Sequence, residues 1–179
     1  MKHIGIAIVL LAALAAAFPQ ESKNAAPGVA SPVVSAVRQM QERYSKNLIG
    51  AADEMPADKY SYRPTPEQIT YAHLMMHVAE ANNGLCAALA GETRAVKLSE
   101  GDSKDTLANA VKESFAYCAQ TLAKSDDSNL GQAVSFAGGQ TSTRAATLVR
   151  LAVGWADHYS AAAMYLRLNN LLPPSASKK

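Results

Sequence analysis

The chain has 179 residues, of which 49% are hydrophobic, 18% charged and 6% aromatic. Seventeen basic and fifteen acidic residues leave a formal net charge of +2 without a basic or acidic tract, which argues against a partner that is a nucleic acid. The length fits one domain with a small appendage, and the abundance of alanine favours helices over sheets.

The N-terminus has the pattern of an export signal. Lys2 and His3 precede an apolar run over 4–18, which is shorter than the roughly 20 residues that a helix needs to span a bilayer. Small residues at 15–17 fit the A-x-A pattern that signal peptidase cleaves. We therefore predict a cleavable signal peptide at 1–17 and an exported mature protein, periplasmic or extracellular, with no membrane attachment. An uncleaved membrane anchor is the alternative.

Four amphipathic helices are predicted after a flexible leader. Residues 18–31 are rich in Ser, Ala, Asn, Pro and Gly and form this leader. Beyond them, apolar residues recur at three- and four-residue steps, as they do on the buried side of a helix. The expected helices span residues 32–52, 67–90, 103–124 and 143–170. Ser31 is the expected N-cap of the first helix, and Gly91 is expected to end the second.

The segments between these helices differ in character. Prolines within 55–66 prevent a continuous helix there. A polar stretch over 93–102 is long enough to cross the end of a bundle, and 130–143 is expected to be a loop without strands. The sequence therefore predicts an all-α fold, a four-helix bundle over 32–174, followed by a disordered tail at 175–179.

The two cysteines are each expected within a helix. Cys86 and Cys118 belong to the second and third predicted helices. In an exported protein, an even number of cysteines permits a disulfide that would tie two neighbouring helices. The alternative is a pair of buried thiols that pack as small apolar residues.

Three histidines remain after the signal peptide. His73 and His77 lie one turn apart on the second predicted helix, so their side chains share a face. His77 and His158 stand beside the apolar residues of their helices and are expected to point inward. There, imidazoles from facing helices can bind a divalent transition metal, with Glu80 orienting a ring of the site. Alternatively, each inward histidine is a hydrogen-bonded core residue.

Several motifs in chain order resemble the DinB-like family. The segment 51–92 contains MPADKYSYRPTP before the helix that bears His77, and the last helix contains DHY, followed by YLR and PPS. The resemblance extends over roughly 33–175 and includes the segment SFAYCAQTLA of the third helix. It implies a four-helix bundle with a long crossover connection.

The resemblance also implies a metal centre of three histidines, one from the second helix and two from an H-x-x-x-H pair on the last. His77 and His158 match two of these ligands, but the remaining position is Gly154. Either His73 replaces the missing ligand from the opposite helix, or the site is a vestige. Where the site is functional, the implied cofactor is one divalent transition metal, zinc or nickel.

Two functions follow from these observations. The first is a helical-bundle protein with a degraded metal site that binds a small molecule or a partner without catalysis. The second is a metal-dependent enzyme related to thiol-dependent transferases, using His77, His158 and His73. The resemblance also favours a homodimer. No nucleophile elbow, Walker loop or dinucleotide-binding glycine motif is present, so whether the chain is an enzyme stays open at this point.

Overall fold

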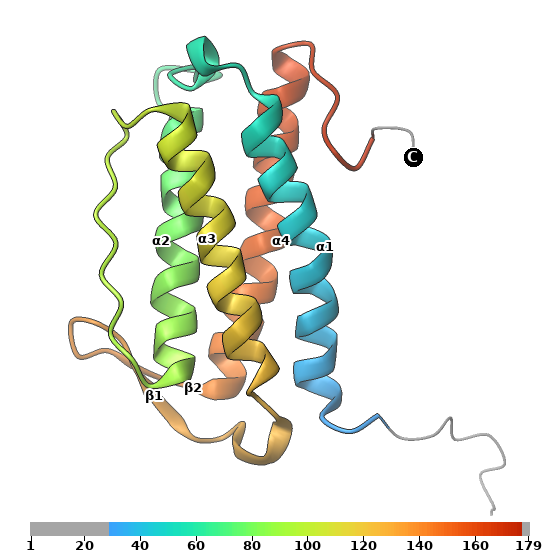
Figure 1. Ribbon diagram of the computed structural model, residues 1–179, viewed down its shortest axis with the longest axis vertical. Coiled ribbons are helices and arrows are strands. Elements are labelled where there is room, and N and C mark those ends of the chain that lie inside the picture. The colour runs from blue at the N-terminus through green and yellow to red at the C-terminus, as the bar shows by residue number, and fades with distance from the viewer. Residues whose placement is uncertain (1–28, 177–179) are drawn as a thin grey trace, which may run out of the picture.

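The computed structural model describes residues 29–176 and has the four long helices that the sequence predicts. They pack lengthwise around one core, as Figure 1 shows. The helices are α1 (Pro32–Glu54), α2 (Tyr71–Ala90), α3 (Lys104–Ala123) and α4 (Arg144–Leu168). None of the helices in the described part is long and apolar enough to traverse a bilayer. The predicted signal peptide at 1–17 lies outside the described residues.

The helices run in two parallel pairs. In Figure 1, α1 and α4 run in one direction, while α2 and α3 run in the other. Because α2 and α3 are parallel, the chain must return over the full length of a helix of about 30 Å before α3 begins. The extended segment at 92–103 makes this return along the outside of α2. The crossover connection is confirmed, but it follows the length of the bundle instead of crossing its end.

A short hairpin joins α3 to α4, where a loop without strands was expected. Strands β1 (Ala133–Ser135) and β2 (Thr141–Thr143) pair antiparallel, with Val134 opposite Ser142. Gly138 and Gly139 supply the turn with φ angles of 92° and 80°, which favour glycine. The prediction was wrong because each strand has three residues, too few for an alternating pattern to be recognised. Two 3₁₀ turns, Ala57–Lys59 and Asp127–Asn129, complete the elements of the described part.

The N-terminal ends of the helices are capped by oxygens of side chains. Ser31 stands at the N-cap of α1 but gives no side-chain cap. Instead, the Asp127 carboxylate accepts hydrogen bonds from the N–H groups of Val33 and Val34 at 2.8 and 2.9 Å. At α2 the Thr70 hydroxyl accepts from the His73 N–H at 3.0 Å, so the helix begins at Tyr71 and not at residue 67.

The C-terminal end of α1 is satisfied by side chains from the next segments. The hydroxyls of Tyr60 and Tyr71 donate to the carbonyls of Ala52 and Ala51 at 2.7 and 2.6 Å. Burial raises the pKa of both tyrosines, so the hydroxyls remain protonated donors. The bond from Tyr60 gives the Ala52 carbonyl a partner in the last turn of the helix, and the bond from Tyr71 adds to the 3.4 Å hydrogen bond that the Ala51 carbonyl accepts from the Met55 N–H.

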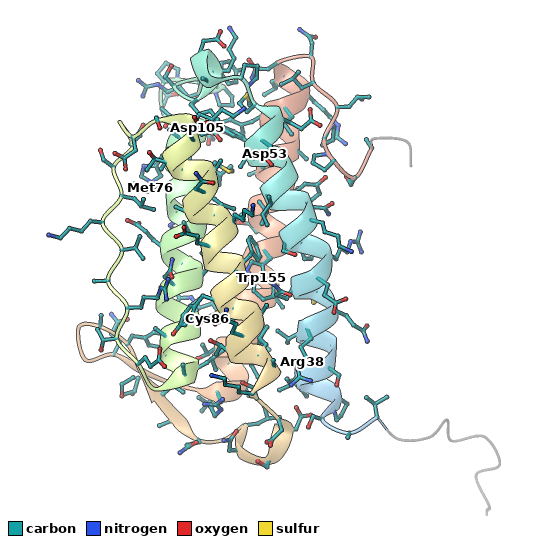
Figure 2. The ribbon with its side chains drawn as sticks, viewed as in Figure 1. Arg38, Asp53, Met76, Cys86, Asp105 and Trp155 are labelled. Atoms are coloured by element: carbon teal, nitrogen blue, oxygen red, sulfur yellow. A yellow bond between two sulfur atoms is a disulfide. The ribbon has the colours of Figure 1, made fainter. Side chains whose placement is uncertain are left out.

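A disulfide and a polar chain connect the helices inside the bundle. Cys86 of α2 and Cys118 of α3 form the predicted disulfide, with their Cα atoms 5.4 Å apart and both residues fully buried. Trp155 of α4 donates from its indole N–H to Asn82 Oδ1 at 2.7 Å, and Asn82 Nδ2 donates to Ser114 Oγ of α3 at 3.0 Å. Figure 2 shows the positions of Cys86 and Trp155 in the bundle. Gly91 ends α2 in the left-handed region, as predicted.

Candidate functional site

A pocket of about 600 Å³ opens between α2 and α4, with the hairpin contributing part of its wall. Its lining combines small, aromatic, aliphatic and charged residues. From α2 these are His77, Glu80, Ala81, Asn82, Gly84 and Leu85; from the hairpin Phe136 and Gln140; and from α4 Arg150, Leu151, Val153, Gly154, Trp155, Asp157 and His158. The pocket thus includes two of the three predicted metal ligands.

His77 and His158 meet in this pocket across the α2–α4 boundary. Their ring centroids lie 4.9 Å apart, and the rings are arranged edge to face at 81°. The side chain of His158 is 19% exposed, whereas His77 is exposed. The expectation that His77 points into the core was therefore wrong: it stands at the open side of the pocket.

The environment of His158 favours the uncharged imidazole. Burial, followed by the neighbouring His77, lowers the pKa of His158, and the Asp157 carboxylate opposes this change. Asp157 Oδ2 lies 3.7 Å from His158 Nδ1, but its side chain is 80% exposed, so water weakens its influence. At neutral pH the His158 ring therefore offers one nitrogen as a donor and the other as an acceptor.

Gly154 lies one turn before His158 on the same helix. A Cβ atom built at Gly154 would meet a single neighbour outside its own helical turn, His158 Nε2, at 3.8 Å. That is an ordinary contact, so packing does not require glycine at this position. Glycine inside a helix costs about 0.5–1 kcal/mol relative to alanine. Its effect here is to leave space beside the His158 ring.

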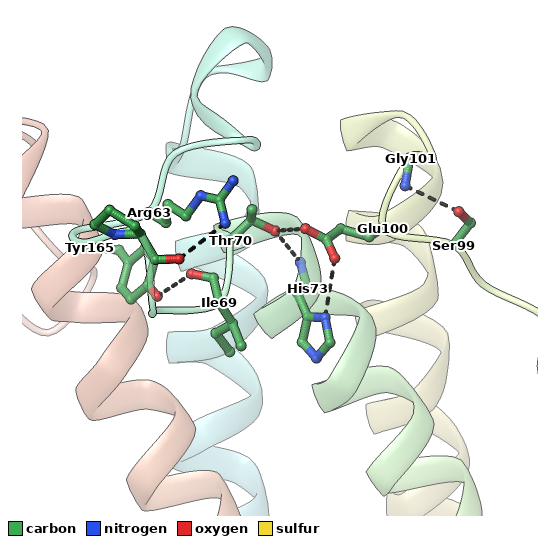
Figure 3. A network of polar contacts seen from close by, with 9 residues as sticks. Arg63, Ile69, Thr70, His73, Ser99, Glu100, Gly101 and Tyr165 are labelled. Atoms are coloured by element: carbon green, nitrogen blue, oxygen red, sulfur yellow. Dashed lines mark hydrogen bonds and ion pairs between the residues drawn. The ribbon is translucent and has the colours of Figure 1, made fainter.

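His73 lies one turn from His77 on the same helix but belongs to another polar cluster, shown in Figure 3. Its ring Nδ1 lies 3.3 Å from Glu100 Oε2, and Glu100 Oε1 accepts a hydrogen bond from the Thr70 hydroxyl at 2.5 Å. The hydrogen bonds from Thr70 and then His73 lower the pKa of Glu100. Nearby, the Tyr165 hydroxyl donates to the Ile69 carbonyl at 2.6 Å.

The donors of the described residues do not form a centre with three ligands. Within residues 29–176, no group of three or more His, Cys, Asp or Glu side chains is arranged to hold a metal ion. His77 and His158 supply two imidazoles, while His73 is engaged by Glu100. A transition-metal site in a protein normally has at least three protein ligands. The residues present therefore do not fit the metal centre implied by the resemblance.

Arg150, Phe136 and Gln140 are among the pocket residues that sequence reasoning did not place at the site. Arg150 lies four residues before Gly154 and eight before His158, so helical periodicity could have placed it on the same face. Phe136 and Gln140 come from the hairpin, and no local pattern links that segment to α2 or α4.

Comparisons with known proteins identify the family of the chain. The sequence model described as the DinB superfamily matches residues 40–160. A search of curated protein sequences finds no relative.

Solved structures show the same fold at low sequence identity. A DinB-like protein from Bacillus cereus is 15% identical, with a TM-score of 0.64 over 78% of this chain and 95% of that one. A DinB-like protein from Bacillus subtilis is 13% identical, with a TM-score of 0.61 over 75% and 92%. A mycothiol-dependent maleylpyruvate isomerase is 18% identical, with a TM-score of 0.55 over 71% of this chain and 59% of the isomerase. At these identities the likeness establishes the fold alone.

Proposed function

The chain belongs to the DinB superfamily, and we propose that it is an exported member that binds a small organic molecule between α2 and α4 without catalysing a reaction. The observation that carries this proposal is the pair of His77 and His158, 4.9 Å apart and open to a pocket of about 600 Å³. Gly154 stands where the resemblance implies a third ligand, so the pocket has space in place of a metal-binding side chain.

The size and lining of the pocket support binding of a small molecule. Its volume lies within the range of roughly 300–1,000 Å³ that is typical of ligand sites. Leu85, Leu151 and Phe136 supply apolar contact, while the two imidazoles and Arg150 supply a small number of polar groups. That combination lets apolar burial provide affinity and polar groups determine orientation.

The single tryptophan of the chain gives a direct test, because Trp155 lines the pocket. We expect small organic compounds that enter the pocket to change its fluorescence. In Gly154→Leu a side chain occupies the space beside His158, and those responses should disappear. Val149→Leu, at an exposed position of the same helix, is the matched control and should respond like the parent. An equal response in Gly154→Leu would contradict binding at this site.

A metal-dependent enzyme related to thiol-dependent transferases is the second candidate. The observation that favours it is the meeting of His77 and His158, the two positions that match ligands of the family. A third ligand would have to come from outside the chain or from His73, and His73 would first have to break its contact with Glu100.

Metal content distinguishes the two candidates. The exported protein, purified without a chelator or a histidine tag, should contain much less than one equivalent of zinc or nickel if it is a metal-free binding protein. Near-stoichiometric metal that is lost in both His77→Ala and His158→Ala would instead contradict a metal-free binding protein and justify a search for the activity of the second candidate. His73→Ala, measured beside them, would show whether the third imidazole takes part.

Gly154→His provides a complementary test of the vestigial site. The new imidazole would stand one turn before His158, in the H-x-x-x-H spacing of two metal ligands. We expect the variant to bind zinc or nickel in calorimetry more tightly than the parent does. A parent that already binds either metal as tightly as the variant would contradict the proposal.

Export is the remaining part of the proposal. It is supported by the signal pattern at 1–17 and by the Cys86–Cys118 disulfide, which is consistent with an oxidising compartment. The full chain expressed with its own N-terminus should yield a mature form that begins at Phe18, as mass spectrometry can establish. Recovery of the uncleaved chain in the membrane fraction would favour the alternative of an anchor.

A further inference from the structure

The lining of the pocket extends over slightly more than two turns of α4, from Arg150 to His158, and small residues lie on both of its sides; we call this lining the groove. Ala81 on α2 and Gly154 on α4 are each four residues from the paired histidines, in antiparallel helices. They therefore lie at about the same level, roughly 6 Å along the bundle from the imidazoles. Gly84, three residues further along α2, has no side chain and leaves additional space. A ligand can thus extend from the histidine pair towards the hairpin.

The two ends of this groove carry different polar groups. At one end are the two imidazoles, together with the carboxylates of Glu80 and Asp157. At the other end is Arg150, eight residues before His158 and therefore about 12 Å away along α4. Within residues 29–176 the structure records neither an ion pair nor a hydrogen bond for the side chain of Arg150. Its guanidinium is thus available to an anionic group of a ligand.

The charges at the two ends of the groove favour one orientation of a bound ligand. The half-buried Glu80 disfavours an anion at the histidine end and can accept a hydrogen bond from a donor there, whereas solvent weakens the influence of the exposed Asp157 carboxylate. An imidazole that is not protonated likewise accepts a hydrogen bond at one nitrogen. Between the ends, Leu85, Leu151 and Phe136 provide apolar surface. The groove is therefore basic at the Arg150 end, apolar in the middle and lined by hydrogen-bond acceptors at the histidine end.

We propose that the groove binds an elongated organic carboxylate with an apolar body and a hydroxyl group at the far end. Its carboxylate pairs with Arg150, its body lies along the apolar wall, and its hydroxyl donates to the His77, His158 and Glu80 group. This inference rests on the proposed binding function and specifies the chemical class of its ligand.

Three matched compounds test the ligand class by calorimetry with the mature protein. The first is 3-(4-hydroxyphenyl)propanoate, which has all three features. The second, 3-phenylpropanoate, lacks the hydroxyl, and the third, tyramine, has an ammonium group in place of the carboxylate. We expect the first compound to bind tightest and tyramine at least about tenfold more weakly, because a charged hydrogen bond to Arg150 is lost.

Two substitutions assign the carboxylate contact. Arg150→Gln should weaken binding of 3-(4-hydroxyphenyl)propanoate about tenfold and leave tyramine unaffected or bound more tightly. Arg167→Gln, at another exposed arginine of α4 outside the pocket, is the control and should leave both affinities unchanged. Equal affinities for the acid and tyramine, or no loss of acid binding in Arg150→Gln, would overturn the ligand class.

Gly154→Leu separates this failure from failure of the proposed function. Compounds that bind without preference for charge, but lose binding in Gly154→Leu, would retain the pocket and overturn only the carboxylate assignment. If none of the three compounds binds, the ligand class is overturned. If the fluorescence screen also finds no compound that depends on the space at Gly154, the binding function is overturned with it.

Discussion

His73 and His77 lie one turn apart on α2, yet they belong to two different kinds of environment. The backbone N–H of His73 donates to Thr70, and its ring lies 3.3 Å from the Glu100 carboxylate. His77 instead meets the His158 ring at the mouth of a pocket. The first histidine has polar partners, Thr70 and Glu100, whereas the second contacts another imidazole and lines a pocket. Helical spacing places both on one face, but neighbouring elements decide what each one does.

The same difference extends to the groups around them. In the His73 cluster, the segment before α3 brings an anion to a helix N-terminus, where the Thr70 cap and the histidine both stabilise it. In the pocket, two imidazoles adjoin each other and burial disfavours the charged form of His158. The first region is therefore held by hydrogen bonds, whereas the structure of residues 29–176 records none for the rings of His77 and His158. The predictions below test this contrast, beginning with the largest expected effect.

Thr70→Ala should damage the His73 cluster most. The variant loses the α2 cap to the His73 N–H and the hydrogen bond to Glu100. We expect a loss of about 1–2 kcal/mol in the free energy of unfolding, measured with urea, because a lost cap alone costs about 1 kcal/mol. Thr65→Ala, at an exposed position in the preceding loop, should stay within about 0.5 kcal/mol of the parent. Equal losses would show that the cluster adds no stability.

Gly154→Ala should raise the free energy of unfolding, the opposite of the effect of Thr70→Ala. Its Cβ has room, with His158 Nε2 at 3.8 Å, and alanine is the better helix former. We expect a gain of about 0.5–1 kcal/mol in urea unfolding. Gly50→Ala in α1 is the matched control, because its Cβ would meet Pro174 Cγ at 2.9 Å and the clash offsets the helical gain. A destabilised Gly154→Ala would show that the space beside His158 is required by the fold.

The helices were predictable from sequence because their signals are local. Apolar periodicity placed all four, and Gly91 gave the correct end of α2. The start of α2 was missed by four residues, since the cap at Thr70 is decided by one hydroxyl among several candidates in a polar segment. The cap of α1 comes from Asp127, which is more than 90 residues away along the chain. No sequence window could contain both partners.

The candidate site was predictable only in part, for the same reason. The family resemblance assigned His77 and His158 to one site, and the structure places their rings together, although His77 is exposed and does not point into the core. Register alone could not separate His73 from them, because Glu100 reaches it from the crossover segment. Nor could it show that the hairpin would bring Phe136 to the pocket. Contacts between segments distant in sequence decided what the histidine pattern left open.

His158 should produce a dependence of stability on pH near neutrality. Because its pKa is lowered on folding, the unfolded chain binds a proton at pH values where the folded protein does not. The contribution of His158 to the free energy of unfolding is complete above the ordinary pKa of 6.5, and it declines as the pH falls from 6.5 to the lowered pKa. In His158→Gln, urea unfolding should lose less stability over this range than the parent does. A decline of the same size in both proteins would exclude His158 as the cause.

The interaction between the two pocket histidines can be measured separately. His77 is the second cause of the lowered pKa of His158, after burial. Removal of its ring in His77→Ala should therefore raise the pKa of His158, as followed by the NMR titration of that ring. An unchanged His158 pKa would show that burial acts alone and that the pair is only a packing contact.

Glu100 should give the smallest effect, at more acidic pH. The hydrogen bond from Thr70 and then that from His73 lower its pKa below the ordinary 4.5, so its contribution is complete above that value and is lost as the pH falls through the lowered pKa. Because Glu100 is exposed, solvent screens the interaction and the effect stays small. In Glu100→Gln, the free energy of unfolding should decrease less than in the parent as the pH falls below 4.5, and it should change little at pH 7.

A matched control separates this contact from the general effect of removing a negative charge. Glu67→Gln removes an exposed carboxylate from the loop before α2. In this variant the free energy of unfolding should decrease below pH 4.5 as steeply as in the parent. Thr70→Ala removes the principal cause of the lowered pKa of Glu100. In that background, Glu100→Gln should therefore change the pH dependence of the free energy of unfolding less than it does in the parent. If Glu100→Gln changes this pH dependence equally in both backgrounds, Thr70 does not stabilise the Glu100 carboxylate. The contrast between the two histidine environments would then rest on His73 alone.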